Sequence, residues 1–289
     1  GVNPLRGQNN VQGAADMGCQ PHQGAGYFPV ADEKIQNFYT EKYGVVHPTK
    51  AGLKIPQIFD AAINKEVKAV WIIGEDVVQT DPNSAHVAKA MNALDLLVVQ
   101  EIFLSETAKH ADVVLPGTTF LEKEGTFTNT ERRVQRVNRA AKPLPGTKPD
   151  GVIVTDMMQK LGYDQKTYDA DEVLAEIADV VPFFKGITRE RLGKLGLQWP
   201  VKEDGTDTKI LHQKEFKLGK GRIKYFDFKE SSELEQNKKE YPLILTTSRV
   251  LQHYNAATMT RRTKNIKIVN EDFLLIHPKD AKHRELNTG

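Results

Sequence analysis

Between residues 54 and 115 the sequence alternates between helical and strand-like patterns, and this alternation limits the possible fold more than any other feature. The run Val67–Ile73 is almost continuously apolar, which predicts a strand buried on both faces. The predicted helices are Lys54–Lys65, Asn83–Leu94 and Ser105–His110, and the predicted strands are Val67–Ile73, Leu96–Gln100 and Val113–Leu115. We therefore expect an α/β fold with a doubly wound, mostly parallel sheet in a three-layer αβα arrangement.

The rest of the chain predicts shorter elements and a change of architecture near the end. The two helices expected after the sheet each open on an aspartate that is suited to cap them. The other predicted elements are a hairpin at 125–137, helices at Asp150–Leu161 and Asp171–Val180, a hairpin around Leu218–Arg222, and strands at Pro242–Thr247 and Phe273–Ile276. We expect the last two strands to belong to the start of a small β-barrel domain.

Composition excludes several classes of protein. The 40 basic and 38 acidic residues leave a net charge of +2, so no nucleic-acid partner is expected. The single cysteine, Cys19, rules out a disulfide within the chain and a zinc or iron–sulfur site made from its own thiolates. We see no apolar run of ~18 residues and no secretion leader. We therefore expect a cytoplasmic protein without direct membrane insertion.

Polar residues follow each of the three predicted parallel strands. They are Gly74-Glu75-Asp76, Gln100-Glu101 and Pro116-Gly117-Thr118-Thr119. Ordinary turn chemistry accounts for any one of these loops. Because ligands bind beyond the carboxyl ends of the strands in such sheets, three polar loops on one edge favour a binding crevice.

The segment 2–18 is rich in amides and glycines around a single guanidinium, that of Arg6. It is poor material for a hydrophobic core. An arginine offers a planar fork of donors that fits a carboxylate, and glycine lets the backbone approach a ligand closely. The segment therefore either binds a small anion or is a polar loop of chance composition.

Five blocks of sequence, in a fixed order, decide between these interpretations. They are Asn3-Pro-Leu-Arg-Gly-Gln-Asn-Asn-Val-Gln-Gly13, Gly74-Glu-Asp-Val-Val-Gln-Thr-Asp81, Ala111-Asp-Val-Val-Leu-Pro116, Glu122-Lys-Glu-Gly-Thr-Phe-Thr-Asn-Thr-Glu-Arg-Arg133, and Ser248-Arg-Val-Leu-Gln-His-Tyr254 with Met259-Thr-Arg-Arg262. Together they resemble the catalytic subunit of the formate dehydrogenases, which are molybdopterin-guanine-dinucleotide oxidoreductases. The resemblance covers almost the entire chain.

The resemblance implies formate oxidation at a molybdenum or tungsten bis(molybdopterin guanine dinucleotide) centre, with electrons leaving through an iron–sulfur cluster to an acceptor subunit or domain. It implies that Arg6 binds the formate carboxylate and that Gln8 lines the same pocket. A bidentate arginine would orient the substrate with its C–H toward the metal.

The resemblance also implies residues that hold the cofactor. At the sheet edge it places Asp76, Thr80, Gln100 and Asp150 against one guanine dinucleotide, with Gly74 allowing close approach and Glu101 beside them. Asp150 has an alternative role as a helix cap. From the last part of the chain, Arg249, His253 and Tyr254 would approach the pterin, although His253 is equally compatible with a structural histidine.

Four parts are expected on this basis. They are an active-site segment (1–50), a guanine-dinucleotide-binding α/β domain (51–165), a helical and hairpin extension (166–239), and the truncated start of the β-barrel (240–289). We expect the chain to be a fragment that lacks the metal ligand and the iron–sulfur cysteines, so no metal ligand is assigned within it. Alone, it is not expected to turn over.

Other functions remain open. One is a sister oxidoreductase that acts on another small oxyanion, and another is a metal-free scaffold or electron-wiring relative. An intact Arg6 segment argues against the scaffold. A nicotinamide-binding domain is the weakest alternative, because no Gly-x-Gly-x-x-Gly follows any predicted strand.

Overall fold

A computed structural model describes residues 5–216 and 218–288. The chain forms two compact units, Gly1–Lys220 (the first unit) and Gly221–Gly289 (the second unit). The four-part division expected from the sequence therefore stays a prediction.

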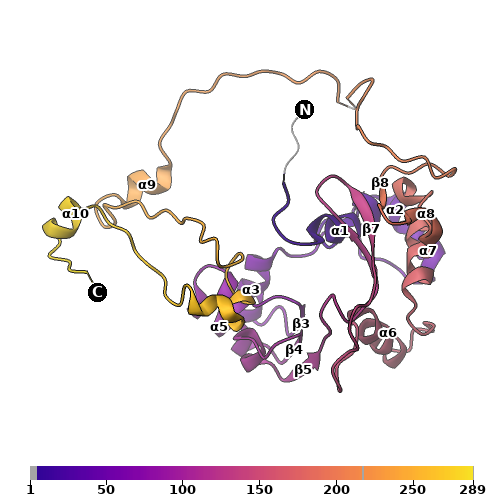
Figure 1. The fold of residues 1–289 in the computed structure, drawn as a ribbon, viewed down its shortest axis with the longest axis horizontal. Helices are drawn as coiled ribbons and strands as arrows, with labels where there is room; N and C mark the ends of the chain where they lie inside the picture. The colour runs from indigo at the N-terminus through magenta and orange to yellow at the C-terminus, as the bar shows by residue number, and fades with distance from the viewer. Residues whose placement is uncertain (1–4, 217, 289) are drawn as a thin grey trace. The chain divides into compact units, whose positions relative to one another are not determined.

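A three-stranded parallel sheet lies in the first unit, as the sequence predicts. Strands β3 (Ala69–Ile73), β4 (Leu96–Glu101) and β5 (Val113–Pro116) pair in the order β3-β4-β5 (Figure 1). Ile73 lies opposite Gln100, and Glu101 lies opposite Pro116. In this register the three carboxyl ends share one edge. The α/β class and the parallel sheet are confirmed.

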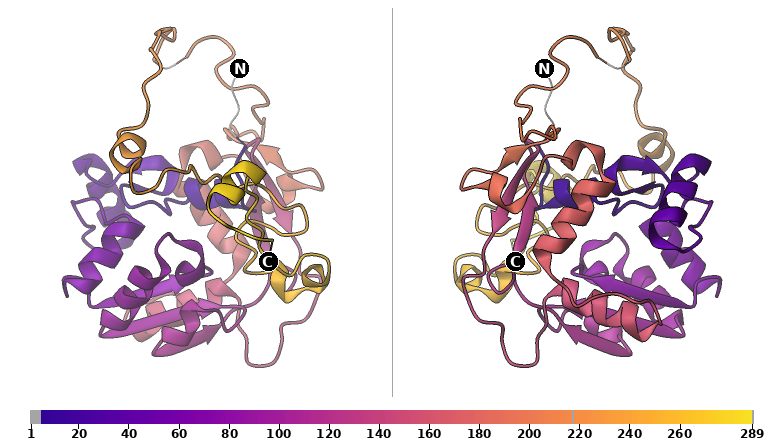
Figure 2. Two further views of the ribbon diagram at one scale, coloured as in Figure 1. Left: turned by 90° about the vertical axis from the view of Figure 1, so that its left-hand side faces the viewer. Right: turned by 90° about the vertical axis from the view of Figure 1, so that its right-hand side faces the viewer.

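The main core lies on one side of this sheet. Helices α3 (Ile55–Ile63) and α5 (Ser84–Ala93) pack there, and their apolar residues form one cluster with those of β3 and β4. The buried members include Phe59, Ala62, Ile72, Val87, Met91, Leu97 and Val99. These are the residues whose helical spacing and strand alternation predicted the fold. Figure 2 shows this part of the chain, residues 55–116 in purple, from two further sides.

The opposite side of the sheet is more open than predicted. Ile73 of β3 is 48% exposed and Leu96 of β4 is 42% exposed, so β3 is not buried along both faces. The reason is that the apolar cluster around α3 and α5 covers the alternate residues Ile72 and Leu97. A continuous apolar run could not reveal which of its faces this chain covers.

The predicted hairpin at 125–137 is also confirmed. Strands β6 (Gly125–Thr128) and β7 (Arg133–Val137) pair in antiparallel fashion, and β7 also pairs with β8 (Leu197–Gln198). A second apolar core packs Val134 of β7 with residues of α7 (Ala170–Val180), including Leu174 and Val180.

The predicted aspartate caps are wrong at both helices. Helix α6 (Asp150–Lys160) has Pro149 at its N-cap and no side-chain cap. Helix α7 is capped by Asp169, which accepts hydrogen bonds from the backbone N–H groups of Asp171 and Glu172. The carboxylates of Asp150 and Asp171 instead accept from cationic side chains, those of Lys123 and Arg189.

The remaining elements of the first unit are short apart from one helix of 11 residues. They are α1 (Val11–Asp16), β1 (Gln23–Gly24), η1 (Ala25–Tyr27), β2 (Phe28–Pro29), α2 (Glu33–Tyr43), α4 (Val77–Thr80), η2 (Thr107–His110), η3 (Pro182–Phe184) and α8 (Arg189–Leu192). None of the helices among the described residues is long and apolar enough to cross a membrane.

The second unit has no strand in its described part, so the predicted start of a β-barrel is not present. It contains α9 (Ser232–Asn237), η4 (Thr260–Arg262), η5 (Lys264–Lys267) and α10 (Pro278–His283). The segments Pro242–Thr247 and Phe273–Ile276 pair with nothing described, and Ile244 and Leu275 are largely exposed. A strand needs a neighbour for its backbone N–H and C=O groups, and here none is supplied. No strands pair among the described residues around Leu218–Arg222, so the hairpin predicted there is not seen.

The core makes a direct stability prediction. Leu97→Ala removes a side chain that is 1% exposed, and we expect it to lower the free energy of unfolding by about 2–5 kcal/mol through lost burial and a residual cavity. Leu104→Ala, at a side chain that is 64% exposed, is the control and should change stability by less than about 0.5 kcal/mol. Denaturant unfolding compares the two variants, and equal losses would contradict the assigned core.

Candidate functional site at the carboxyl edge of the sheet

The three polar loops predicted from the sequence meet at one edge. Gly74 N–H donates to Gln100 C=O at 2.9 Å, and Gly117 N–H donates to Glu101 C=O at 3.0 Å. Gly74 has a φ of +66°, a conformation that favours glycine. The chain therefore turns sharply as it leaves β3, and the ends of β3, β4 and β5 stay in register.

Asp76 is buried just after β3, and its carboxylate is engaged within the chain. It accepts from Thr107 N–H at 2.8 Å, from Thr107 Oγ1 at 2.6 Å and from Glu106 N–H at 3.4 Å. These bonds join the loop after β3 to η2. Thr80 lies one helical turn further, and its hydroxyl donates to Glu75 at 2.8 Å.

Glu101 ends β4 beside these acids. Burial is the main cause that raises the pKa of its carboxyl above the ordinary value of 4.5, with the charges of Asp76 and Glu75 adding to the effect. The backbone N–H of Ile102 donates to it at 2.7 Å and opposes the shift. The edge is thus a partly desolvated cluster of acids.

Asp150 lies at the same edge and joins two side chains. Gln100 Nε2 donates to Asp150 Oδ1 at 2.7 Å, and Lys123 forms an ion pair with Oδ2. Gly117 also lies here, since a Cβ at that position would be 3.3 Å from Asp150 Oδ1. Four predicted site residues, Gly74, Gln100, Glu101 and Asp150, therefore lie within one connected edge.

Two buried oxygens at this edge have no partner among the described residues. One is Gln100 Oε1, at the end of β4, and the other is Thr118 Oγ1, just after β5. A buried polar atom that lacks a partner costs free energy, so such atoms are typical of sites that a ligand or water completes. The sequence marked the loop of Thr118 as polar but did not single the residue out.

A cavity of about 290 Å³ connects this edge to the amino-terminal segment. Its lining includes Asn10, Gly13, Lys123, Phe127, Asp150 and Tyr168. Its volume is at the lower end of the range for ligand pockets, about 300–1,000 Å³.

The predicted anion-binding residues, Arg6 and Gln8, are exposed in the stretch that leads into α1. Asn10 follows, and its Oδ1 accepts from Thr128 N–H of β6 at 2.9 Å. Gly13 makes this bond possible, because a Cβ there would lie 2.2 Å from Asn10 Oδ1. The close packing of the Asn10 side chain therefore explains why residue 13 is a glycine.

The described part of the segment 2–18 is more buried than its polar composition predicts. Gln12 and Asp16 are buried, and Asp16 accepts three side-chain hydrogen bonds, from Gln12, Tyr27 and Trp199. Sequence reasoning missed Asp16, Tyr27 and Trp199. A single acid among amides does not reveal from the sequence that it will be buried, because its hydrogen-bond donors come from distant residues.

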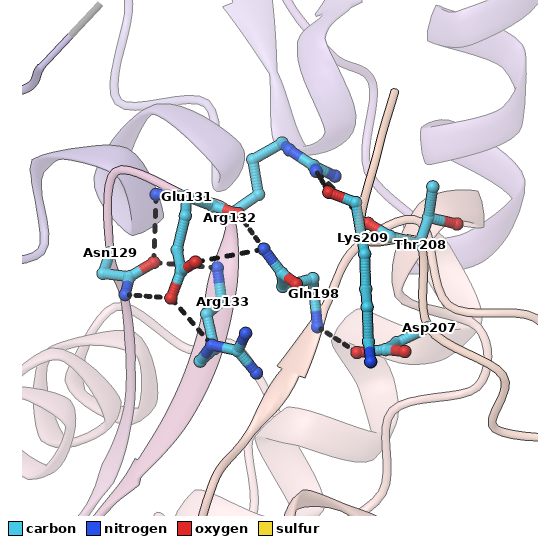
Figure 3. Close-up of polar contacts among 8 residues, drawn as sticks. All are labelled: Asn129, Glu131, Arg132, Arg133, Gln198, Asp207, Thr208 and Lys209. Carbon is cyan, nitrogen blue, oxygen red and sulfur yellow. Dashed lines mark hydrogen bonds and ion pairs between the residues drawn. The ribbon is translucent and has the colours of Figure 1, made fainter. Parts of the chain in front are cut away.

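The tip of the β6–β7 hairpin is built from polar contacts (Figure 3). Asn129 Oδ1 accepts from the N–H groups of Glu131 and Arg133, at 3.1 and 3.0 Å, which closes the turn. Arg132 donates to the backbone carbonyls of Trp199, Thr208 and Lys209, so it ties the hairpin to the segment after β8.

The three predicted pterin-facing residues lie in the second unit. His253 is buried, with Nε2 2.7 Å from Val269 C=O and Nδ1 3.1 Å from Thr260 Oγ1, which corresponds to a ring that donates through Nε2 and accepts through Nδ1. Arg249 and Tyr254 are exposed, and Tyr254 N–H donates to Thr260 Oγ1 at 3.2 Å. Within this unit His253 therefore organises a loop.

The family follows from a comparison of the sequence with family models. The model of the molybdopterin oxidoreductases matches residues 4–160, more than half of the chain. The chain belongs to the molybdopterin oxidoreductase family. This confirms the predicted resemblance at the level of the family. A second model, "Molydopterin dinucleotide binding domain", matches residues 243–289 of this molybdopterin oxidoreductase.

Several curated proteins are similar to it along its whole length. It is 45% identical to the F420-dependent formate dehydrogenase subunit alpha of Methanocaldococcus jannaschii, covering 100% of this chain and 43% of that protein. It is 44% identical to the F420-dependent formate dehydrogenase 1 subunit alpha of Methanococcus maripaludis, covering 98% of this chain and 42% of that protein. The chain thus spans less than half the length of these relatives.

A solved structure supports the fold. Acetylene hydratase from Pelobacter acetylenicus matches with a TM-score of 0.59 and 20% sequence identity, over 88% of this chain and 38% of that one. The edge described above offers two buried oxygens that a polar ligand could engage. Gln100 Oε1 offers an unused acceptor for base or sugar N–H and O–H groups, and Thr118 Oγ1 offers both an acceptor and a donor.

The acid cluster predicts a pH-dependent stability difference. A raised pKa means that Glu101 favours folding below its unfolded pKa, and that this contribution is lost as the pH rises through the folded value. We therefore expect Glu101→Gln to raise Tm at pH 7, and the gain to shrink toward pH 4. Thermal unfolding at both pH values tests this, with the exposed Glu106→Gln as the control. A gain that is equal at both pH values would contradict it.

Proposed function

We propose that the whole protein oxidises formate to carbon dioxide at a molybdenum or tungsten bis(molybdopterin guanine dinucleotide) centre. The observation that carries the proposal is the nearness in sequence of Arg6 to α1, which lines a cavity together with the sheet-edge residue Asp150. Arg6 itself is exposed. The names of the relatives point to the same substrate.

Arg6 supplies recognition of the substrate anion in this proposal. Its guanidinium presents two parallel N–H groups to the two carboxylate oxygens, which fixes the direction of the formate C–H bond. Gln8 adds a neutral donor or acceptor two residues away. The oxidation converts formate to carbon dioxide, one proton and two electrons.

Each unit carries residues that we assign, taken by itself, to part of the cofactor. At the sheet edge we assign Gly74, Asp76, Thr80, Gln100, Glu101 and Asp150 to the guanine dinucleotide, and in the second unit we assign Arg249, His253 and Tyr254 to the pterin. Carboxylates suit the N–H groups of guanine, and Lys123, which pairs with Asp150, suits a phosphate. When bound, the metal centre accepts the two electrons of the reaction.

We propose that these electrons leave through an iron–sulfur cluster to another subunit or domain. Both named relatives are described as F420-dependent, so reduction of F420 is the first acceptor reaction to measure. We place the protein in the cytoplasm.

Formate-dependent dye reduction by the whole protein, with metal and pterin analysis on the same sample, tests the proposed function. Activity with about one metal per chain is the expected result. Metal without formate activity would indicate a sister oxidoreductase acting on another small oxyanion. Neither metal nor activity, in a host that makes the cofactor, would indicate a scaffold.

The role of Arg6 predicts a sharp loss on a conservative change. Arg6→Lys keeps the charge but removes the fork, and we expect kcat/KM for formate to fall by about 100-fold, the equivalent of roughly 2.7 kcal/mol. Metal content should not change. Arg139→Lys, at an exposed arginine, is the matched control and should behave as the parent protein does. Near-normal turnover by Arg6→Lys would exclude the bidentate role.

Removing the buried hydroxyl of Thr118 should affect stability and cofactor content in opposite directions. Thr118→Val removes a buried oxygen that has no described partner, so the cofactor-free protein should melt at the same or a higher temperature. If the hydroxyl contacts the cofactor, pterin and metal content should fall several-fold. Thr155→Val, at a buried threonine of α6, is the control. Unchanged cofactor content would contradict a contact at Thr118.

A further inference from the structure

Asp16, the last residue of α1, is fully buried and accepts bonds from three other side chains. Gln12 Nε2 and Tyr27 OH donate to Oδ1 at 2.9 and 2.7 Å. Trp199 Nε1 donates to Oδ2 at 2.9 Å. Both oxygens therefore face donors.

The donors come from three places in the sequence. Gln12 is on α1 itself, Tyr27 ends η1, and Trp199 follows β8. Trp199 is itself held by Arg132, which donates to its carbonyl and places its guanidinium 5.4 Å from the indole centroid. Asp16 thus joins the short helix α1 to segments up to 183 residues away.

Two features indicate that this arrangement around Asp16 costs free energy of folding. Burial raises the pKa of the Asp16 carboxyl, and the three hydrogen bonds and the positive charge of Arg6 act in the opposite direction. Tyr27 has a φ of 62°, which is strained for an aromatic residue, and in this conformation its hydroxyl reaches Asp16. Apolar residues of similar volume usually fill such a position at lower cost in stability.

Helix α1 needs such a support. It has six residues, too few for a helix to be stable by itself, and its N-cap Asn10 makes no side-chain cap bond. A further tie is the bond from Thr128 N–H to Asn10 Oδ1. Arg6 and Gln8 lie directly before α1, so the position of the helix sets where they emerge.

We propose that Asp16 is a positioning residue for formate: through Gln12, Tyr27 and Trp199 it holds α1 in place, and α1 holds Arg6 and Gln8 in register with the substrate. This role rests on the proposed function, because it assigns Asp16 to the reaction of Arg6. Asp16 does not touch the substrate.

The chemistry of the three donors provides the test. Asp16→Asn has the same shape but offers one acceptor and one donor group. Its amide N–H₂ faces either the indole N–H of Trp199, which can only donate, or Tyr27 and Gln12, which must then turn to present an acceptor oxygen. Trp199→Phe removes the indole N–H. The double variant should therefore recover part of what Asp16→Asn loses. A purely additive double variant would contradict a direct Asp16–Trp199 tie.

Steady-state formate oxidation by the whole protein gives the first readout. We expect Asp16→Asn to lower kcat/KM by about 10–100-fold, with KM for formate raised and metal and pterin content unchanged. Trp199→Phe should act in the same direction with a smaller effect, and it replaces Asp16→Asn if that variant does not fold. Asp179→Asn, at an exposed carboxylate of α7, is the matched control and should leave the kinetics unchanged.

Hydrogen exchange of the amides in residues 8–18 is the second readout, and it does not depend on activity. We expect faster exchange in Asp16→Asn and Trp199→Phe but not in Asp179→Asn. Unchanged exchange would overturn the tie. Faster exchange with unchanged KM and kcat would overturn the positioning role. A parent protein that exchanges normally but does not oxidise formate would overturn the proposed function itself, and with it the assignment of Asp16 to that reaction.

Discussion

The parallel pairing of β3, β4 and β5 is the constraint on which the rest of the structure depends. Because Ile73, Gln100 and Leu115 lie side by side in register, three loops that are distant in the sequence start from one edge. Parallel strands need helical crossovers, and the amphipathic faces of α3 and α5 form the core with the sheet. The polar edge is thus a consequence of the same apolar pattern that builds the core.

Buried and half-buried carboxylates connect the segments that the sheet does not reach. Asp76 joins the loop after β3 to η2, Asp150 joins α6 to β4 and to Lys123, and Asp16 joins α1 to Tyr27 and Trp199. Each uses its oxygens as acceptors for donors from elsewhere in the chain, which offsets the cost of burying the charge. The unused oxygens of Gln100 and Thr118 are exceptions to this pattern, and they lie where the dinucleotide is proposed to bind.

Local patterns were enough for the elements of the first unit but not for their ends or their polar contacts. The helical spacing around Phe59 and the apolar run ending at Ile73 predicted α3 and β3 to within a few residues. Asp150 was compatible with a cap or a site residue, and only the position of Lys123 and Gln100 excludes the cap. The strands expected in the second unit failed because apolar alternation indicates a tendency to pair, whereas a strand also requires a partner.

The sequence by itself determined the α/β class, the parallel pairing of the sheet and the family, because these depend on periodicity and on motifs that are contiguous in the chain. The tertiary structure alone decided which side of the sheet the helices cover and which acids are buried. It also decided that Asp16 meets an indole N–H 183 residues further along. Such contacts depend on distance in space, and neither composition nor spacing records which remote donor will reach a given oxygen.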